Sequence, residues 1–232
     1  MTKLSGPAKA AYVHNMFDRI AHRYDLMNNL MTMGQHKNWR RAAARLARPP
    51  RNGLALDLAT GTGDFAVALQ DAEPTCRVIG VDLALEMMSF GQEKYDGRVA
   101  FAEGDMLQLP LESSCFDCTV NGFVLRNVVD VRQAFVEMYR ILKPNGRAVS
   151  LEITSPRTPV WRDLFALYFD HAMPRLGGWI SGQPEAYRYL PQSVHDFLAP
   201  EAVAGLLREV GFRDVSYQRW ALGTIAVYVG VK

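Results

Sequence analysis

The chain contains only three cysteines, an odd number. Cys115 and Cys118 form a Cys-x-x-Cys without a second pair, so all three, Cys76 included, are more simply interpreted as buried, reduced thiols than as a zinc or redox site. The chain has no run of 18 apolar residues that would predict a membrane span, and we expect no signal peptide at its start. We therefore expect a cytoplasmic, metal-free protein, whose 232 residues, 49% of them hydrophobic, suffice for one principal domain.

Acidic residues are scarce at the start of the chain. Residues 1–52 hold ten Lys and Arg against only Asp18 and Asp25, a balance of +8, whereas the remaining 180 residues carry −6. This asymmetry favours contact with a membrane surface or a nucleic acid, although a solvated basic helix face is the simpler alternative. No aromatic and basic RNA-binding motif accompanies it, so we predict no nucleic-acid partner.

The most informative stretch, residues 56–64, lacks a third glycine. An apolar run ends there on Asp57 and turns through Gly61 and Gly63, whose missing Cβ lets the backbone approach a ligand. The dinucleotide-binding pattern has a glycine where this chain has Ala66, and it binds a pyrophosphate, which Asp57 repels. A carboxylate suits an ammonium group such as that of S-adenosylmethionine. The stretch resembles motif I of class I methyltransferases.

Two further acidic positions follow predicted strands. Asp82 ends a buried run, 25 residues after Asp57, where a carboxylate can accept hydrogen bonds from both ribose hydroxyls. Asp105 and Met106 follow a third run, and the resemblance to class I methyltransferases implies that they contact adenine. Each acid alone is equally well explained as a solvated loop or helix-cap residue. Three acids at the ends of successive strands favour a nucleotide-like ligand.

Apolar runs alternate with helical patterns along most of the chain. Strands are expected at 54–58, 77–81, 99–103, 116–121, 147–153, 214–220 and 224–231, and a last helix at 201–210. A helical pattern before Lys143-Pro144-Asn145-Gly146 is expected to end because Pro144 cannot continue it and Gly146 supplies the turn. The alternation predicts an α/β, class I methyltransferase-like Rossmann fold: a mostly parallel seven-stranded sheet with helices on both faces, helical substrate caps, and ligands at the carboxyl ends of the strands.

We divide this domain into four segments. Residues 1–52 form an N-terminal helical cap, 53–154 the S-adenosylmethionine-binding core, 155–200 a substrate-cap insertion, and 201–232 the helix and strands that complete the sheet. Both caps mix aromatic residues and Met with polar ones, as a cover over an apolar, planar substrate does, although core packing explains many of the same aromatics.

Motifs outside the cofactor core make the resemblance more specific. They are Tyr24-Asp25-Leu26-Met27-Asn28, the phrase from Gly34 to Arg40, Leu125-Arg126-Asn127-Val128, the Lys-Pro-x-Gly turn, the phrase from His171 to Arg175, and Tyr187-Arg188-Tyr189-Leu190-Pro191-Gln192-Ser193. With these, residues 12–231 resemble the menaquinone and ubiquinone biosynthesis C-methyltransferases. The chain departs from that pattern at Ala59-Thr60, and Gly122 and Val124 stand where relatives often have Ser and Gly, which leaves the adenosine contacts near Gly122 the least defined.

The resemblance implies methyl transfer from S-adenosylmethionine to a ring carbon of a demethylmenaquinol, with a demethylated ubiquinol precursor as the alternative substrate. An ionised quinol oxygen makes the adjacent carbon nucleophilic, and Arg126 is expected to stabilise this oxyanion unless it pairs with a nearby carboxylate. A guanidinium does not readily accept a proton. Relatives suggest a water held by Arg126 and Asn127 for that step, with His36 or His171 as the alternative base.

The other residues expected at the site form two groups. The predicted cofactor contacts are Asp57, Gly61, Thr62, Gly63, Asp82, Asp105, Met106 and Gly122. The predicted substrate contacts are Tyr24, Asn28, Trp39, Tyr187 and Tyr189. Two other classes remain open: an NAD-dependent oxidoreductase, disfavoured by Asp57 and the absent third glycine, and a noncatalytic S-adenosylmethionine-binding module, disfavoured by Arg126, Asn127 and the caps.

The implied substrate also gives the basic segment a role. A buried carbon is worth about 0.8 kcal/mol, so withdrawing one five-carbon isoprenoid unit from lipid costs about 4 kcal/mol. The ring should therefore enter the cap while the tail remains in the bilayer. We expect a membrane-embedded quinol as partner and transient, peripheral contact with the inner face of the membrane through residues 1–52, worth about 1 kcal/mol per basic side chain. A homodimer is left open.

Overall fold

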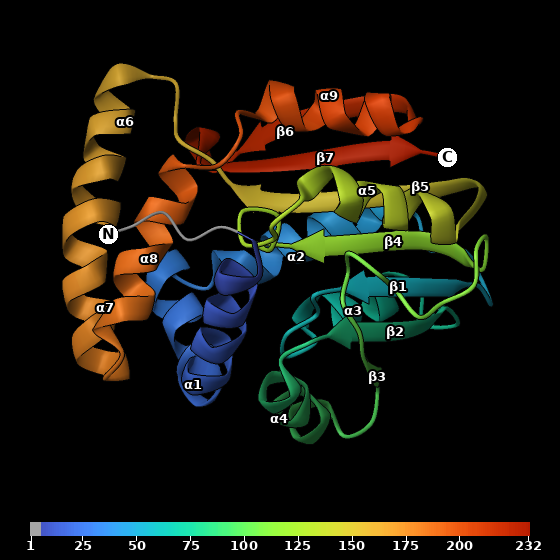
Figure 1. Cartoon of the computed structure of the whole chain (residues 1–232), viewed down its shortest axis with the longest axis horizontal. Helices are drawn as coiled ribbons and strands as arrows, with labels where there is room; N and C mark the ends of the chain where they lie inside the picture. Colours follow the sequence, from blue (N-terminus) through green and yellow to red (C-terminus); the bar gives the residue numbers. More distant parts are fainter. Residues whose placement is uncertain (1–5) are drawn as a thin grey trace.

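The computed structural model describes residues 6–232, and a seven-stranded sheet forms its centre (Figure 1). The strand order is β3-β2-β1-β4-β5-β7-β6. The strands β3, β2, β1, β4 and β5 run parallel to one another, and β7 is antiparallel to both β5 and β6. The predicted mostly parallel, seven-stranded sheet is confirmed. Its strands are β1 (Leu54–Leu58), β2 (Arg77–Asp82), β3 (Ala100–Glu103), β4 (Phe116–Gly122), β5 (Leu142–Ile153), β6 (Arg213–Trp220) and β7 (Ile225–Val231).

Helices cover both faces because the central strands are apolar on both sides, and every residue of β1 after Leu54 is buried. The helices α2 (Gln35–Ala47) and α3 (Asp64–Ala72) contribute small buried residues to the core of one face. The helices α5 (Val131–Ile141) and α9 (Pro200–Val210) pack on the other. Asp130 caps α5, its side chain accepting a hydrogen bond from the backbone N–H of Gln133.

A separate layer of helices lies beyond the carboxyl ends of the parallel strands (Figure 1). It consists of α1 (Gly6–Thr32), α6 (Pro159–Ala166), the π-helical segment η1 (Leu167–Ala172), α7 (Met173–Ser181) and α8 (Pro184–His195). Buried residues such as Met16, Ile20 and Phe169 form an apolar cluster between α1 and the other cap helices. The remaining elements are α4 (Leu85–Tyr95), which contacts α1, and the short η2 (Ala221–Gly223). Among residues 6–232, no helix is both long and apolar enough to cross a membrane.

The turn predicted at Lys143-Pro144-Asn145-Gly146 is present as an irregularity within β5, since Leu142 pairs with Phe116 and Arg147 with Cys118, and these four residues stand opposite Asp117 alone. Helix α5 does end at Ile141, but β5 begins at Leu142 and runs through all four residues, so this strand starts five residues before the predicted position. The left-handed backbone belongs to Asn145, with φ of 66°, a conformation that asparagine tolerates. Gly146 meets a different need, because a Cβ there would lie 2.8 Å from the carbonyl oxygen of Lys143.

The three cysteines are free thiols. Cys76 and Cys118 are buried, as predicted, whereas Cys115 is only half-buried. Burial raises the pKa of the Cys118 thiol to about 12, which keeps it protonated and unreactive. Within the described part of the chain, no group of three or more His, Cys, Asp or Glu side chains is placed to hold a metal ion.

Candidate active site

The loop between β1 and α3 turns through three left-handed residues. Gly61 and Gly63 have φ of 56° and 82°, as expected for glycines in this loop, but Ala59 has φ of 53°, which is strained for a residue with a Cβ. The loop is anchored from β2, since the backbone N–H of Gly61 donates to Asp82 Oδ2 at 2.7 Å. Gly63 opens α3, and a Cβ there would lie 2.8 Å from the Phe101 ring.

Asp57 is buried directly beneath this loop, only 1% exposed. Its Oδ2 accepts hydrogen bonds from the Thr60 hydroxyl at 2.6 Å and from the backbone N–H of Ala66 at 3.0 Å. Its Oδ1 has no hydrogen-bond partner among the described residues, although the carboxylate lines a pocket of about 300 Å³. Burial raises the pKa of Asp57 to about 7. A buried acceptor without a donor is costly, so this oxygen is suited to a cationic ligand.

Arg40 lies in the wall of the same pocket. Its guanidinium is 6% exposed, stacks over Phe123 at 5.1 Å from the ring centre, and has Nη1 3.9 Å from Asp64 Oδ2. Although burial raises the pKa of Asp64, Arg40 and Lys94 bring it down to about 2. The pocket thus presents one arginine and two carboxylates within a small volume. This arrangement suits a zwitterion.

His36 is buried on α2 and forms a hydrogen bond with the guanidinium of Arg40. Its Nδ1 lies 2.6 Å from Arg40 Nη1, and its Nε2 lies 3.1 Å from Asn29 Oδ1. Since Arg40 can only donate, Nδ1 is the acceptor and Nε2 carries the proton. Burial, together with the charge of Arg40, lowers the pKa of His36 to about 4. The lone pair of this predicted base is therefore already occupied by Arg40.

A larger hollow of about 900 Å³ adjoins the small pocket and shares Tyr24, Ala59, Gly61 and Gly122 with it. Asp82 and Asp105 stand in its wall at the ends of β2 and β3. The backbone N–H groups of Gly61 and Ala84 occupy one site on each oxygen of Asp82, which leaves further lone pairs for hydroxyl donors. Asp105 Oδ1 accepts from the backbone N–H of Leu107 at 2.8 Å, and Met106 lies beside it.

Seven of the eight predicted cofactor contacts line one of these two cavities. The eighth, Gly63, lies behind them at the start of α3. Gly122, where relatives often have Ser, lines both, and a Cβ there would lie 3.0 Å from the Phe65 ring.

Helix α1 roofs both cavities. His14, Phe17 and Tyr24 contribute to the walls. Asp25 of α1 holds this helix on the core, because it accepts hydrogen bonds from Thr62 of the glycine loop at 3.1 Å and from Lys94 of α4. The closed site is thus held by contacts that cross from the cap to the core.

The predicted catalytic residue Arg126 turns away from the large hollow. Its Nη1 donates to Glu152 Oε1 and to the carbonyl oxygen of Phe123, both at 2.5 Å. Arg126 is 8% exposed and Glu152 fully buried, so this is a desolvated ion pair. The pairing with a carboxylate that the sequence left open is therefore present. Arg126 Nε has no partner among residues 6–232.

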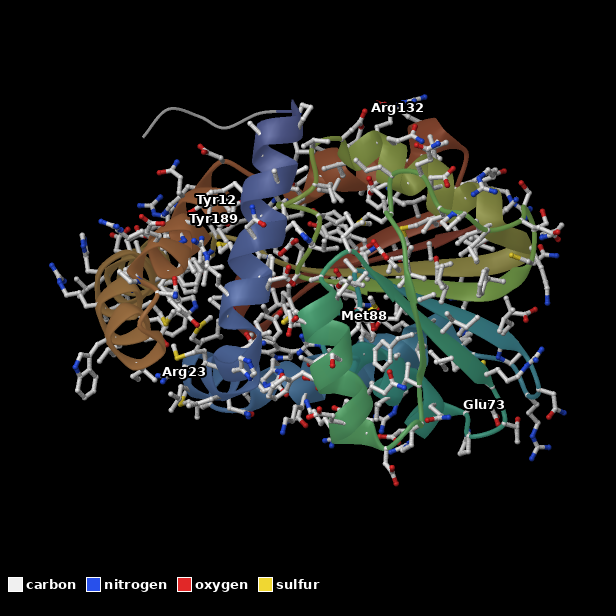
Figure 2. All side chains as sticks on the ribbon, turned by 60° about the horizontal axis from the view of Figure 1, so that its bottom comes forward. Tyr12, Arg23, Glu73, Met88, Arg132 and Tyr189 are labelled. Carbon is white, nitrogen blue, oxygen red and sulfur yellow. The ribbon has the colours of Figure 1, made fainter. Side chains whose placement is uncertain are left out.

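Asn127 and Tyr189 come together across the gap between the core and the cap. Asn127 lines the large hollow, and its Oδ1 accepts from the Tyr189 hydroxyl at 3.3 Å. Tyr189 also packs against Tyr12 of α1, with ring centres 5.6 Å apart (Figure 2). Tyr24 lines both cavities. Of these predicted residues, Tyr24 and Asn127 line the large hollow, whereas Tyr189 lies outside both cavities and reaches the site through its hydrogen bond to Asn127.

Four other predicted residues lie outside both cavities. Asn28 follows Tyr24 by one turn of α1, and its buried Nδ2 has no partner among the described residues. Trp39 packs on the core of the sheet beside α2 and α3. Tyr187 is buried against Gly177 in the cap. His171 lines a different hollow, between η1, α7 and α8.

The family model described as the ubiE/COQ5 methyltransferase family matches residues 6–232. The chain belongs to this family. A demethylmenaquinone methyltransferase of Roseiflexus castenholzii is 44% identical over 225 residues, covering 97% of this chain and 94% of that protein. One of Thermus thermophilus is 42% identical, covering 93% and 99%. The ubiquinone/menaquinone biosynthesis C-methyltransferase UbiE of Desulfotalea psychrophila is 40% identical, covering 97% and 92%.

Solved structures confirm the fold class. A methyltransferase of Thermotoga maritima described as a possible histamine N-methyltransferase has a TM-score of 0.69 and 19% identity, covering 94% of this chain and 98% of that one. Phosphoethanolamine N-methyltransferase 2 of Haemonchus contortus, in complex with S-adenosyl-L-methionine, has a TM-score of 0.61 and 16% identity, covering 84% and 52%. As a member of the ubiE/COQ5 family, the chain is a methyltransferase that uses S-adenosyl-L-methionine.

Two functional candidates were missed in the sequence of this methyltransferase. The sequence places Arg40 among the basic residues of 1–52 that are expected to contact the membrane, or to form a solvated face, and both are wrong for Arg40 because it is buried in the small pocket. Lys3, from the same count, lies outside the described residues. Glu152 has no signal in the sequence, because it lies 26 residues from its partner Arg126. The spacing of His36 and Arg40, four apart on one helix face, was the available signal.

Proposed function

We propose that this methyltransferase converts a demethylmenaquinol to menaquinol. The full-length similarity to demethylmenaquinone methyltransferases supports the substrate. The observation that carries the proposal is the pair of adjoining cavities, one small and lined by Arg40 and Asp57, the other larger and bounded by Tyr24, Asn127 and Asp82. One fits a zwitterion, and the other leaves room for a nucleoside and a ring.

The residues of the small pocket fit the methionine part of the cofactor. The unpartnered Asp57 Oδ1 would hold the ammonium group, and Arg40 the carboxylate. Asp82 would accept from the ribose hydroxyls, and Asp105 and Met106 would bound the adenine. When bound, S-adenosylmethionine supplies a methyl group made electrophilic by the sulfonium.

The chain must in turn favour the ionised quinol. Asn127 and Tyr189, held together by their hydrogen bond, orient the ring oxygen. Arg126 lies outside both cavities and pairs with Glu152, so it can stabilise the developing oxyanion only if its guanidinium turns from Glu152 toward the ring. A water held by Asn127 and Arg126 receives the proton. His36 is left to position Arg40, and His171 is outside this set.

The test compares two soluble, short-chain acceptors. We expect the purified enzyme, with S-adenosylmethionine, to methylate a short-chain demethylmenaquinol, the product being identified by mass. A preference for a demethylated ubiquinol precursor would establish the alternative substrate. Methylation of neither acceptor in their reduced forms would refute the proposal.

The proposed partner is a quinol whose tail stays in the bilayer, with peripheral contact at the inner face of the membrane. The cost of about 4 kcal/mol per extracted isoprenoid unit supports this arrangement. Because Arg40 is buried, only other basic residues of the first 52, such as Arg41 and Arg45, can contribute charge at the surface.

A further inference from the structure

The outer side of the cap carries most of the large apolar side chains that are exposed in the described chain. Fourteen such residues are exposed over residues 6–232, and nine of them belong to the C-terminal part of α1, to the turn that follows it, or to the α6–η1–α7 column. Met33 is 87% exposed, Trp179 85% and Val160 72%. We call the following set the outer cap face: Leu26, Leu30, Met33, Val160, Leu164, Leu167, Tyr168, Leu176 and Trp179.

The two parts of this face are joined. The Tyr168 hydroxyl donates to the carbonyl oxygen of Met31 at 3.1 Å, and Arg23 donates to the carbonyl oxygen of Ile180. Figure 1 shows α6 and α7 stacked end to end at the edge of the molecule, on the side away from the sheet. Single exposed apolar residues are ordinary, but a joined group of this size marks a surface that contacts something apolar.

The π-helical segment η1 aligns the column. Val160, Leu164 and Leu167 have the i, i+4, i+7 spacing of one helix face. In an unbroken α-helix, at about 100° per residue, Trp179 would point about 120° away from Leu167. The extra residue in η1 reduces this to about 20° and brings Trp179 back to the same face.

Apolar contacts connect this face to the active site. The cluster behind it contains Phe169 and Met173 of the column, Met27 of α1, and, at its inner end, Tyr24 and Tyr189. Tyr24 lines both cavities, and Tyr189 bonds Asn127. An isoprenoid tail leaving the ring site between α1 and the column would therefore meet apolar side chains as far as the outer cap face.

Basic groups border the face. Beside η1 and α7, a hollow of about 740 Å³ is lined by His171, Arg175, Arg188 and His195. His195 pairs with Asp170 at 2.9 Å, but Arg175 and Arg188 form no ion pair within the described residues. Arg175 donates to the carbonyl oxygen of His171, but arginines without a carboxylate partner, next to an exposed tryptophan and leucines, match the phosphates and acyl chains of an anionic lipid surface.

We infer that the outer cap face is where this enzyme docks on an anionic phospholipid bilayer. Trp179, Leu176 and Leu164 enter the boundary between headgroups and acyl chains, and Arg175 and Arg188 bind lipid phosphates. The inference rests on the proposed function, because a quinol kept in lipid gives the enzyme a reason to dock. The outer cap face thereby replaces the basic residues of 1–52, Arg41 and Arg45 of α2 among them, as the principal membrane contact.

The test uses the whole protein and vesicles of phosphatidylcholine with and without phosphatidylglycerol. We expect the double variant L176S/W179S to bind anionic vesicles about tenfold more weakly than the wild type in sedimentation, since binding scales with the apolar area inserted. Arg175→Glu with Arg188→Glu should remove the preference for anionic lipid. Leu222→Ser, at a leucine outside the face that is 72% exposed, is the matched control and should bind like the wild type.

Two readouts separate docking from catalysis. Methylation of a long-chain quinol in vesicles should fall with vesicle binding in L176S/W179S, while methylation of a soluble short-chain quinol stays unchanged. If the protein methylates neither quinol, the proposed function fails while vesicle binding still tests the docking face. Wild-type vesicle binding by L176S/W179S, with loss in an R41E/R45E variant, would assign docking to α2 and overturn the inference. The inference would also be overturned if the wild type forms a dimer and the L176S/W179S variant is a monomer, because a second copy of the chain would then cover the face.

Discussion

Cofactor binding should depend on pH through Asp57. In the ligand-free protein, burial raises the pKa of this carboxyl to about 7, so at pH 7 about half of the molecules carry the proton and cannot pair with an ammonium group. Lowering the pH to 5.5 leaves about 3% of the molecules ionised, and the apparent affinity for S-adenosylmethionine should fall about fifteenfold. The α-ammonium of the ligand, with a pKa near 8, stays charged throughout this range.

Calorimetry can isolate this effect. Titrations with S-adenosylmethionine at pH 7 and 5.5 give the affinity ratio, and buffers of different ionisation enthalpy should show about half a proton released at pH 7. Methylthioadenosine, which lacks the amino acid, controls for titration of Asp82, whose pKa burial also raises. Asp57→Asn should bind S-adenosylmethionine weakly at both pH values. Asp57 does not control binding if both ligands show the same pH dependence, or if Asp57→Asn retains the pH dependence of the wild type.

Three other changes have defined outcomes. Asp82→Ala loses charge-assisted bonds to the ribose and should weaken S-adenosylmethionine binding at least tenfold in calorimetry. Ala59→Gly relieves a left-handed conformation that costs about 1–2 kcal/mol, less the extra chain entropy of glycine, and should raise the free energy of unfolding in urea by up to about 1 kcal/mol. Glu152→Gln leaves the buried charge of Arg126 without a carboxylate partner and should lower the free energy of unfolding by about 3–5 kcal/mol.

Matched variants show whether these effects are specific. Asp96→Ala, on an exposed turn, should bind the cofactor normally, and equal loss in both variants would remove Asp82 from the site. Ala202→Gly, at an exposed helical position, should destabilise by about 1 kcal/mol, and the same result for Ala59→Gly would contradict the strain argument. Asp71→Asn breaks the exposed pair with Arg98 and should cost at most about 1 kcal/mol. A comparably small cost for Glu152→Gln would mean that Arg126 does not depend on its partner.

The sequence predicted the sheet, and it predicted acidic residues that the structure brings together at one edge of that sheet, because both follow from short-range patterns. Asp57, Asp82 and Asp105 each end a run of apolar residues, and parallel strands bring such ends to one edge. The substrate side was harder. Trp39 and Tyr187 are aromatic, but aromatic character does not tell a wall of a cavity from the core.

Side-chain direction was the least predictable property. Arg126 sits at the predicted position, yet its orientation depends on Glu152, one strand away in the sheet. Arg40 differs from its exposed neighbour Arg41 only in the face of α2 that it occupies. The alignment of Trp179 with Leu167 could not be read from their spacing, because it depends on the π-helical segment between them.

The contacts of Asp25 with Thr62 and Lys94 bear on how the two ligands enter and leave the site. Because α1 provides walls for both cavities and is tied to Thr62 and Lys94, we expect a used cofactor to leave when this helix lifts. A water-soluble cofactor and a lipid-soluble quinol would then reach the same closed chamber from opposite sides, one past the raised helix and the other along its apolar seam with the cap. We expect the opening of α1 to limit turnover in such an enzyme, and the methyl transfer itself to take place while the helix is closed over the site.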